Sequence, residues 1–423
     1  MPQGEWDSAR GANPTERVEP PVESAAPDLV QRAELAALAA DSGLDSIRIV
    51  AWRDIDDPEA GGSELHAHQL ATEWAAAGLR VTLRTSAVVG SPEVVRRNGY
   101  RVVRRSGRYA VFPRAIFEGL RHGAPAGECL IEIWNGMPFL SPLWLRGPRV
   151  VFLHHVHAEM WKMTLPGWMA RLGSSFEQRW APPVYRSTRI VTLSESSRSE
   201  IIELLGIPGD HITVAPPGIE PHFSPGSVSD RSATPLVLAV GRLVPVKRFD
   251  RLFDELALVR RRVPNLKCVV VGEGIERSAL ESLRCRMEAE SWIALPGRVK
   301  RDDLVALYRQ AWVLASSSLR EGWGMTLTEA AACGTPAVAT DIVGHRDAVT
   351  HGVSGLLADD RPGRLGVALT EVLSDAVLRR RLSKGALDRA RWFNWDRTAR
   401  ITLEALATEV RRHSGGATDE ARV

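Results

Sequence analysis

The sequence predicts an α/β protein with two doubly wound, Rossmann-like domains that face each other across a cleft. Three observations support this prediction. At 423 residues the chain is too long for one ordinary domain. Apolar strand patterns alternate with helical patterns in both halves, which is typical of parallel sheets with helical crossovers. A stretch rich in Pro, Gly, Ser and Asp, 216–235, separates the halves as an inter-domain linker would.

The first half opens with a strand–helix–strand unit, and a glycine loop, Gly61-Gly62-Ser63, joins its first strand to the helix. Within the helix Leu65, Leu70 and Trp74 recur at helical spacing, and Gly78 ends it. These patterns predict an N-terminal domain over 46–225. The expected strands are 46–51, 80–85, 129–133, 150–153 and 190–193, and the helix is 64–78.

The second half repeats the alternation and predicts a C-terminal domain over 233–395, with strands at 235–241, 267–272, 311–315 and 335–339. A last helix is expected at about 398–411, within a C-terminal segment 396–413, and residues 414–423 are expected to form a flexible tail. At the other end, 1–40 is expected to be largely disordered apart from a short helix at 29–40, because Pro, Glu, Ser and Ala predominate before Leu29.

Composition excludes several classes of protein. The chain is 44% hydrophobic and 25% charged, as globular proteins are, and its net charge of +3 does not favour nucleic-acid binding. Four scattered cysteines without CxxC spacing fit a reducing cytoplasm better than disulfides or zinc. The N-terminus lacks the apolar run of a signal peptide, and no run reaches the roughly 18 residues of a spanning helix. We therefore expect a cytoplasmic protein that is at most peripheral to a membrane.

Two cations follow the first strand of the second half. That strand is expected to end at Gly241, and Arg242 and Lys247 then lie on a turn that leads into a helix. Helix amides and two cations suit an anion such as a diphosphate. A solvated basic turn explains this segment equally well when it is considered alone.

A motif with two glutamates lies further along. Its glycines, Gly322 and Gly324, let backbone amides approach a ligand closely. A helix is expected from about 326 to 333, so that Glu321 precedes it and Glu329 lies within it, about two turns further on. Because alanines surround Glu329, its carboxylate needs hydrogen-bond partners, and sugar or ribose hydroxyls are suitable. The alternative, that both acids cap nearby amides, fits this arrangement less well.

Together these segments resemble the signature of the retaining GT-B glycosyltransferases of family 4. That family has a Gly-Arg-x-x-x-x-Lys turn and a Glu-x7-Glu motif of the form EGFG…E-A-x-A-x-G-x-P. The second motif here is Glu321-Gly-Trp-Gly-Met-Thr-Leu-Thr-Glu329-Ala-Ala-Ala-Cys-Gly-Thr-Pro336, followed by Gly352-Val-Ser-Gly-Leu-Leu357. The resemblance spans about 47–395 and implies the GT-B fold. It also implies that the helix after Trp392-Phe-Asn-Trp395 crosses back to the N-terminal domain.

The resemblance implies roles for individual residues. Arg242 and Lys247 would bind the donor diphosphate, Glu321 would hold hydroxyls of the transferred sugar, and Glu329 would hold the ribose. The amides of Gly324, Met325 and Thr326 would contact sugar and phosphates, and Gly61 and Gly62 would approach the diphosphate from the opposite wall. No cofactor is implied, since the UDP- or GDP-sugar is the donor substrate. Val343-Gly344-His-Arg-Asp347 departs from the family's Gly-Gly-x-x-Glu, so the sugar contact there is expected to differ.

Several histidines and acids elsewhere in the sequence are further candidates for site residues. The family often carries a His near the transferred sugar, and in His154-His155-Val-His157 the first matches that place best, with His157 second and a core histidine as the alternative. A metal site is not favoured, because no Cys or acid stands at ligand spacing. Asp54-Ile-Asp56 is interpreted as an acidic loop, and His66 and His68 as a poor ligand pair.

A basic segment leaves two interpretations open. Between 96 and 121 there are eight arginines and one acid, Glu118. Together with Trp168 and with Leu172, Phe176 and Trp180 at i, i+4 spacing, this segment is compatible with an anionic membrane or a lipid-linked acceptor. A solvated basic face with a separate core helix is the interpretation that we favour.

The predicted function is hexosyl transfer from a nucleoside diphosphate sugar to a carbohydrate, glycoconjugate or lipid-linked acceptor, with retention and without a metal. The alternative is a nucleotide-sugar epimerase or a glycan phosphorylase of the same architecture. An epimerase would convert the donor without an acceptor, and a phosphorylase would need a lysine site for pyridoxal phosphate. A non-catalytic sugar-binding module is disfavoured, because Arg242, Lys247, Glu321 and Glu329 occur together.

Overall fold

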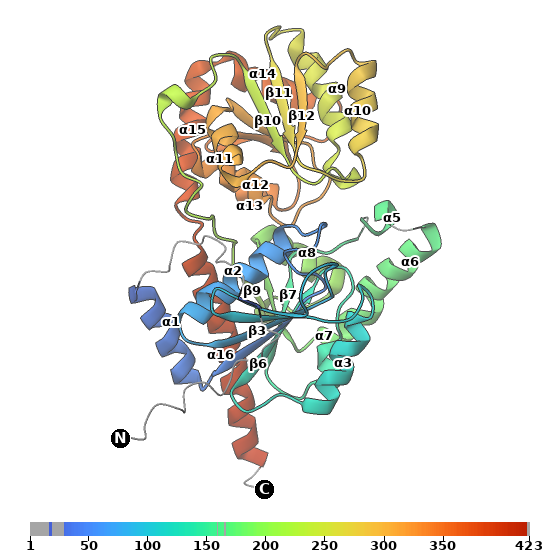
Figure 1. Cartoon of the computed structure of the whole chain (residues 1–423), viewed down its shortest axis with the longest axis vertical. Coiled ribbons are helices and arrows are strands. Elements are labelled where there is room, and N and C mark those ends of the chain that lie inside the picture. The colour runs from blue at the N-terminus through green and yellow to red at the C-terminus, as the bar shows by residue number, and fades with distance from the viewer. Residues whose placement is uncertain (1–16, 19–28, 159, 165, 421–423) are drawn as a thin grey trace, which may run out of the picture. The chain divides into compact units, whose positions relative to one another are not determined.

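Two sheets organise the chain, and both are flanked by helices (Figure 1). The structure, a computed structural model, describes residues 17–18, 29–158, 160–164 and 166–420. The chain divides into two compact units. The first comprises the described residues of 1–134, 138–152 and 403–423, and the second comprises those of 135–137 and 153–402. The predicted fold class of two doubly wound α/β sheets is confirmed.

The first sheet has nine strands in the order β1-β4-β5-β3-β2-β6-β7-β8-β9. Strand β2 pairs in parallel with β3 and β6, and β3 pairs in parallel with β5. The bounds are β1 (Arg17–Val18), β2 (Ser46–Val50), β3 (Arg80–Thr85), β4 (Val94–Arg97), β5 (Tyr100–Arg104), β6 (Glu128–Trp134), β7 (Arg149–Leu153), β8 (Arg189–Thr192) and β9 (Ile212–Val214).

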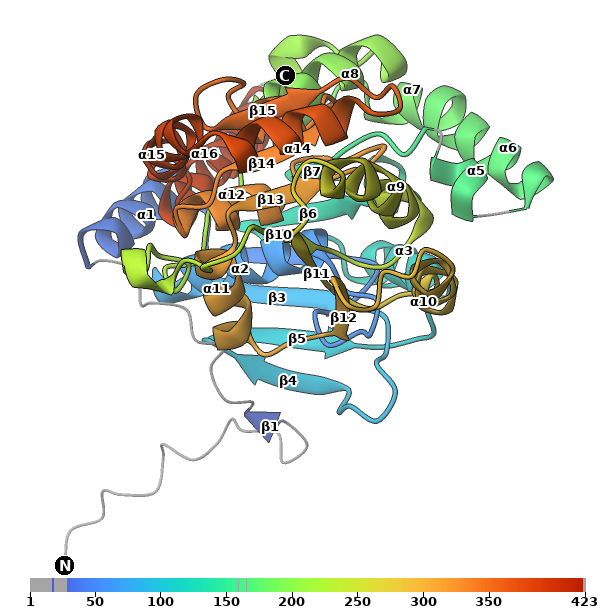
Figure 2. The ribbon, with the colours of Figure 1, turned by 90° about the horizontal axis from the view of Figure 1, so that it is seen from above.

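The sequence analysis missed the hairpin of β4 and β5. These strands are antiparallel, and β5 lies next to β3 with β4 beyond it (Figure 2). Asn98 and Gly99 turn the chain between them with φ of 45° and 88°, in the left-handed region. An Asn-Gly pair between β-branched runs is a strong hairpin signal, and it was present in the sequence.

The helices of this part of the chain are α1 (Leu29–Ser42), α2 (Gly62–Ala76), α3 (Val111–His122), α4 (Ser141–Trp144), α5 (Met160–Thr164), α6 (Gly167–Ser175), α7 (Ala181–Tyr185) and α8 (Glu195–Leu205), with a π-helical turn at Phe176–Trp180 and a 3₁₀ turn at Gly209–His211. Helix α3 packs on Trp144 through Gly119, where a Cβ would come within 2.1 Å of the indole. Glycine is therefore required at this contact.

The second sheet has six strands in the order β12-β11-β10-β13-β14-β15. All five of its strand pairs are parallel. The bounds are β10 (Leu236–Val240), β11 (Lys267–Val271), β12 (Ile293–Gly297), β13 (Val313–Ser316), β14 (Ala337–Thr340) and β15 (Gly355–Ala358).

Two hydrophobic cores cover the faces of the second sheet. Side chains alternate along β10, so that Val237 and Ala239 enter one core while Leu236 and Leu238 enter the other. The helices are α9 (Phe249–Arg260), α10 (Arg277–Arg286), α11 (Arg301–Gln310), α12 (Met325–Ala332), α13 (His345–Ala348), α14 (Arg364–Ser374), α15 (Ala376–Ala390) and α16 (Trp395–Glu420), with 3₁₀ turns at Val228–Asp230 and Pro245–Lys247.

Several element boundaries differ from the predictions. Helix α16 continues to Glu420, nine residues beyond the predicted end at 411, because glycine weakens a helix by about 1 kcal/mol without forbidding it. Helix α2 begins at Gly62, so Gly62 and Ser63 lie in its first turn rather than in a loop. The expectation of disorder before Leu29 lies outside the described residues, except that Arg17 and Val18 form β1 and pair with β4.

The segment with Leu172, Phe176 and Trp180 is not the core helix that its spacing predicted. Leu172 is 62% exposed and Trp180 is 71% exposed. The chain passes from α6 into a π-helical turn at Phe176, so the i, i+4 spacing no longer defines one face. Within the described part of the chain, no helix combines the length and apolarity that crossing a bilayer requires.

Candidate active site

The predicted diphosphate-binding segment and the glutamate motif follow adjacent strands of the second sheet. Strands β10 and β13 are neighbours, and the strand order reverses between them. Ligands of open α/β sheets bind outside the carboxyl ends of the strands at such a switch point. The loop 241–248 follows β10 and the loop 317–324 follows β13, so the topology brings both predicted segments to this point.

Hydrogen bonds join these two loops. Leu319 N donates to Val246 O at 2.8 Å. Ser317 Oγ donates to Lys247 O at 2.9 Å, and Arg248 Nε donates back to Ser317 O at 2.9 Å. Gly272, at the end of β11, also packs against the first loop, because a Cβ there would lie 1.8 Å from Gly241 O. The position of Lys247 is therefore set by three strands rather than by its own turn alone.

Lys247 and Glu321 form an ion pair across the switch point. Their side chains are 20% and 17% exposed, so both charges are largely shielded from water. Ser318 Oγ donates to Glu321 Oε1 at 2.9 Å. Burial acts to raise the pKa of Glu321, but the Lys247 charge and these hydrogen bonds outweigh it and lower the pKa below its ordinary value. Glu321 is therefore an ionised acceptor beside a cation.

Arg242 is exposed and precedes the 3₁₀ turn that carries Lys247. The structure thus places both predicted cations on one short loop.

His345 belongs to this region, although the sequence analysis named it only within a departure from the family pattern. It is fully buried, and its Nδ1 lies 2.8 Å from Thr340 O. Since a carbonyl only accepts, Nδ1 carries a proton, and burial lowers the pKa of the ring, which favours the neutral form. The negative charge of Glu321 acts on the ring in the opposite direction. Gly344 lets this loop pack on Glu321, because a Cβ there would lie 2.6 Å from Glu321 O.

Glu329 lies on α12 and accepts a hydrogen bond from Tyr308 OH at 2.7 Å. Burial raises the pKa of Glu329 from 4.5 to about 7, against the Tyr308 hydrogen bond, which lowers it. The charge of Glu220 raises this pKa further. Tyr308 was missed by the sequence analysis, because a tyrosine on α11 carries no local signal of its contact with α12.

The start of α12 supplies backbone amides. Gly324 precedes the helix with φ of 91°, and Met325 and Thr326 form its first turn. The first N–H groups of a helix have no partner within the helix, and its N-terminus favours negative charge. Helix α12 begins four residues beyond Glu321, at the end of the same loop.

His154 follows β7, and its backbone reaches the glutamate motif. A Cβ on Gly322 would lie 2.8 Å from His154 O and 3.2 Å from the ring of His155. The His154 side chain is 6% exposed. Arg320 Nε donates to Val156 O at 2.9 Å, which ties the histidine segment to the residue before Glu321. The structure therefore brings His154 and Glu321 into one neighbourhood.

Glu177 fixes the other end of the histidine segment. It is fully buried in the π-helical turn, and it accepts from His157 N at 2.8 Å, Ala158 N at 3.0 Å and Trp161 Nε1 at 3.0 Å. The sequence analysis missed this residue, since its partners lie about 20 positions upstream.

Gly61 and Gly62 belong to the first compact unit. Gly61 N donates to Glu64 Oε2 at 2.8 Å, which closes the first turn of α2. Glu64 also lies 3.2 Å from Arg53 Nε. These contacts order the glycine turn at the start of α2.

The Asp54-Ile-Asp56 string is not the acidic loop that we expected. Asp54 is fully buried and lies 3.2 Å from Arg104 Nη2 and 3.6 Å from Arg97 Nη1. Asp56 lies 2.7 Å from Arg97 Nη2. Two arginines of the 96–121 segment are thus counter-ions in the interior, not part of a solvated face. In the part of the chain that the structure describes, no three His, Cys, Asp or Glu side chains gather as metal ligands.

Comparison with known proteins agrees with this architecture. The chain matches the family described as Glycosyltransferase Family 4 over 60–223 and that described as Glycosyl transferases group 1 over 226–389. D-inositol 3-phosphate glycosyltransferase of Pseudarthrobacter chlorophenolicus is 28% identical over 392 residues, or 84% of this chain and 92% of the relative.

Two solved structures share the fold. Sucrose-phosphate synthase of Thermosynechococcus elongatus has a TM-score of 0.72 at 20% identity, over 84% of this chain and 96% of that one. HepE of Anabaena, solved in complex with UDP and glucose, has a TM-score of 0.64 at 17% identity, over 89% of this chain and 99% of that one.

Two doubly wound sheets define the GT-B fold, and the two family matches identify the chain as a glycosyltransferase. The protein transfers a sugar from a nucleotide-sugar donor. It belongs to glycosyltransferase family 4, whose members retain the anomeric configuration of the donor.

Proposed function

We propose that this enzyme transfers a hexosyl group from a UDP-sugar to a hydroxyl of a carbohydrate or glycoconjugate acceptor. The observation that carries the proposal is the Lys247–Glu321 ion pair at the β10–β13 switch point. UDP is the first nucleotide to test, because HepE was solved with UDP and glucose.

The pair suits a sugar linked to a diphosphate. In the absence of donor, Lys247 and Glu321 neutralise each other. A diphosphate offers Lys247 a second anionic partner, and the sugar hydroxyls offer Glu321 donors in place of the lysine. One ligand that carries both groups therefore satisfies both charges at once, which a phosphate or a sugar alone does not.

The remaining residues take roles around this pair. Arg242 adds a second cation for the diphosphate, and the amides of Gly324, Met325 and Thr326 point to the anionic and sugar portions of the donor. Glu329 accepts from the ribose. Gly61 and Gly62 contribute backbone amides to the diphosphate, and His154 approaches the transferred sugar.

The rate enhancement comes from electrostatics. As the bond between sugar and diphosphate breaks, negative charge grows on the leaving phosphate, where Arg242, Lys247 and the α12 amides stabilise it. Departure of the diphosphate needs no enzyme nucleophile. The acceptor hydroxyl attacks on the same face, and its proton passes to the departing phosphate oxygen.

The test is a thermal-shift panel of UDP-, GDP- and ADP-sugars, followed by transfer assays with the best binder. We expect a UDP-hexose to give the largest rise in Tm. The acceptor panel includes D-inositol 3-phosphate, after the relative that carries it in its name. The donor proposal fails if no sugar nucleotide raises Tm, and conversion of the donor without an acceptor would favour an epimerase.

A further inference from the structure

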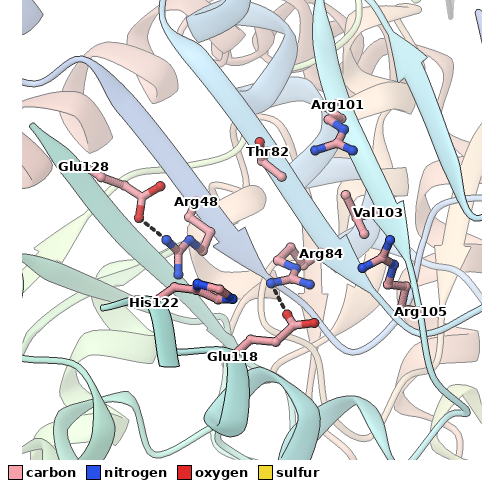
Figure 3. A pocket seen from close by; sticks show the side chains of 9 residues that line it. All are labelled: Arg48, Thr82, Arg84, Arg101, Val103, Arg105, Glu118, His122 and Glu128. Carbon is pink, nitrogen blue, oxygen red and sulfur yellow. Dashed lines mark hydrogen bonds and ion pairs between the residues drawn. The ribbon is translucent and has the colours of Figure 1, made fainter. Parts of the chain in front are cut away.

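The first compact unit contains a hollow of about 240 Å³ on one face of its sheet. By liquid volume this is room for roughly eight waters. The lining comes from three strands, from helix α3 and from the start of β6 (Figure 3), and consists of Arg48, Thr82, Arg84, Arg101, Val103, Arg105, Glu118, His122 and Glu128. None of these residues belongs to the candidate active site.

The sheet register explains the shape of the hollow. Arg48, Thr82 and Arg101 are direct partners on β2, β3 and β5, so they form one transverse row. Adjacent strands lie about 4.8 Å apart, which places the two arginines roughly 10 Å apart with the short threonine between them. Arg84 pairs with Val103 in the next row. Short side chains thus form the floor, and guanidinium groups form the walls.

The walls carry more positive than negative charge. Four arginines line the hollow, against two glutamates. Glu128 pairs with Arg48 and Glu118 pairs with Arg84 (Figure 3). Arg105 pairs with Glu93 at the rim, and Arg96 stands directly opposite Arg101 on β4. Like charges directly opposite each other destabilise a sheet, and a bound anion would relieve this.

We propose that this hollow is a binding site for a phosphate group. Guanidinium forks match phosphate oxygens in pairs, which a single lysine cannot do. The hydroxyl of Thr82 on the floor adds a neutral donor. All residues of this hollow belong to the first unit, and none of them is among the residues assigned to the sugar donor.

The phosphate has two sources to distinguish. It belongs either to a small molecule in solution or to the headgroup of an anionic lipid. The second source is considered because Phe117 and Leu120 of α3, the helix that supplies Glu118 and His122, are 62% and 66% exposed.

The experiment measures pyrophosphate binding by calorimetry. The donor site is first saturated with UDP, GDP or ADP, whichever gives the largest rise in Tm. Wild type is compared with the double variant Arg101→Gln/Arg105→Gln. The variant Arg261→Gln/Arg262→Gln carries the same charge change at exposed positions after α9 and is the control. We expect affinity to fall at least tenfold in the first variant and to stay unchanged in the control, because charge-assisted hydrogen bonds to phosphate are lost.

A parallel arm measures co-sedimentation with phosphatidic acid vesicles, against phosphatidylcholine vesicles. Binding that requires Arg101 and Arg105, and is also lost in Phe117→Ser/Leu120→Ser, identifies the lipid source. Pyrophosphate binding alone identifies the soluble source. The proposal is overturned if Arg101→Gln/Arg105→Gln binds pyrophosphate and phosphatidic acid vesicles as well as wild type does. It is also overturned if wild type binds neither probe. If no nucleotide raises Tm, the donor proposal fails but the phosphate-site proposal does not. Pyrophosphate binding by wild type and by the variants can then be compared without a nucleotide in the donor site.

Discussion

At the scale of single residues, the candidate active site consists of charges whose partners come from other strands and helices. Lys247 is paired with Glu321, and Glu329 is bonded to Tyr308. The Lys247 contact keeps Glu321 ionised before a ligand arrives, whereas burial raises the pKa of Glu329 to about 7 against the Tyr308 hydrogen bond. The pKa values of these two carboxyl groups of one motif are therefore shifted in opposite directions.

Removing either proposed diphosphate cation should abolish most transfer. We expect Lys247→Ala and Arg242→Ala each to lower kcat by about a hundredfold or more, the effect of losing one preorganised group that stabilises developing negative charge. Steady-state transfer assays measure this. Lys384→Ala, an exposed lysine on α15, is the control and should retain full activity. Near-normal turnover in either active-site variant would refute the assignment.

The carboxyl of Glu329 should make stability depend on pH. Because its pKa is about 7 in the folded protein and 4.5 ordinarily, folding favours the protonated form. Its contribution is fully present below about pH 4.5 and is lost as the pH rises through 7. Wild type should therefore lose stability relative to Glu329→Gln between pH 5 and pH 8 in urea unfolding. The exposed Glu34→Gln should show no such trend, and a pH-independent difference for Glu329→Gln would contradict this explanation.

At the scale of elements, the loops of the site are fixed by contacts that leave little room for change. Glycines allow close approach at the ends of β11 and β14, and a buried glutamate organises the turn after β7.

The glycine at the end of β11 should be irreplaceable. In Gly272→Ala a Cβ would lie 1.8 Å from Gly241 O, at φ of 144°. We expect the free energy of unfolding to fall by about 3 kcal/mol or more, since the backbone must move. Gly107→Ala is the matched control, because a Cβ there meets nothing within 4 Å. Thermal unfolding of the two variants measures the contrast, and equal Tm values would refute it.

Glu177 should stabilise the histidine segment. Glu177→Gln replaces a carboxylate oxygen by an amide NH₂, which cannot accept the hydrogen bonds that the carboxylate accepts. We therefore expect the free energy of unfolding to fall by about 1–3 kcal/mol. Chemical denaturation measures it. Glu203→Gln, exposed on α8, should change stability little. If both variants unfold alike, the hydrogen bonds of Glu177 contribute nothing measurable.

Local patterns predicted β10, β11, β13 and β14 of the second sheet and missed its edge strands, β12 and β15. The apolar runs that became β10, β11, β13 and β14 are continuous, as strands buried on both faces should be. On β3 polar and apolar residues alternate instead, because one face of that strand borders the basic hollow. The hairpin signal of Asn98-Gly99 lies within the arginine-rich segment.

The candidate site could be predicted only in part. The motifs predicted that Lys247 and Glu321 lie in one site, and the two residues form an ion pair. They meet because both follow neighbouring strands of one parallel sheet. His345, Tyr308 and Glu177 were not predicted, because each acts through a contact that only tertiary packing creates. The Asp54 string was misjudged for the same reason, since its arginine partners come from β4 and β5.

At the scale of the whole molecule, the charged side chains fall into two groups with different roles. Some are structural counter-ions, as Asp54 is for Arg97 and Arg104, and others line surfaces open to ligands. In the described residues no cluster of acids or histidines has metal-binding geometry.

The proposed roles of Arg242 and Lys247 predict that transfer persists without divalent metal. We expect the rate in EDTA to match the rate in magnesium within about twofold, because cations of the protein act on the leaving phosphate. The control restores magnesium after chelation. Complete loss of transfer in EDTA, reversed by a divalent ion, would show that a metal is needed.

The ion pair between Lys247 and Glu321 bears on how the enzyme empties after each cycle. On the proposed roles, the intact donor engages both side chains, whereas the nucleotide left behind has lost the hydroxyls that held Glu321. The spent nucleotide then competes with the glutamate for one lysine. Re-formation of the ion pair in this way would help to expel the product and leave the site ready for the next donor.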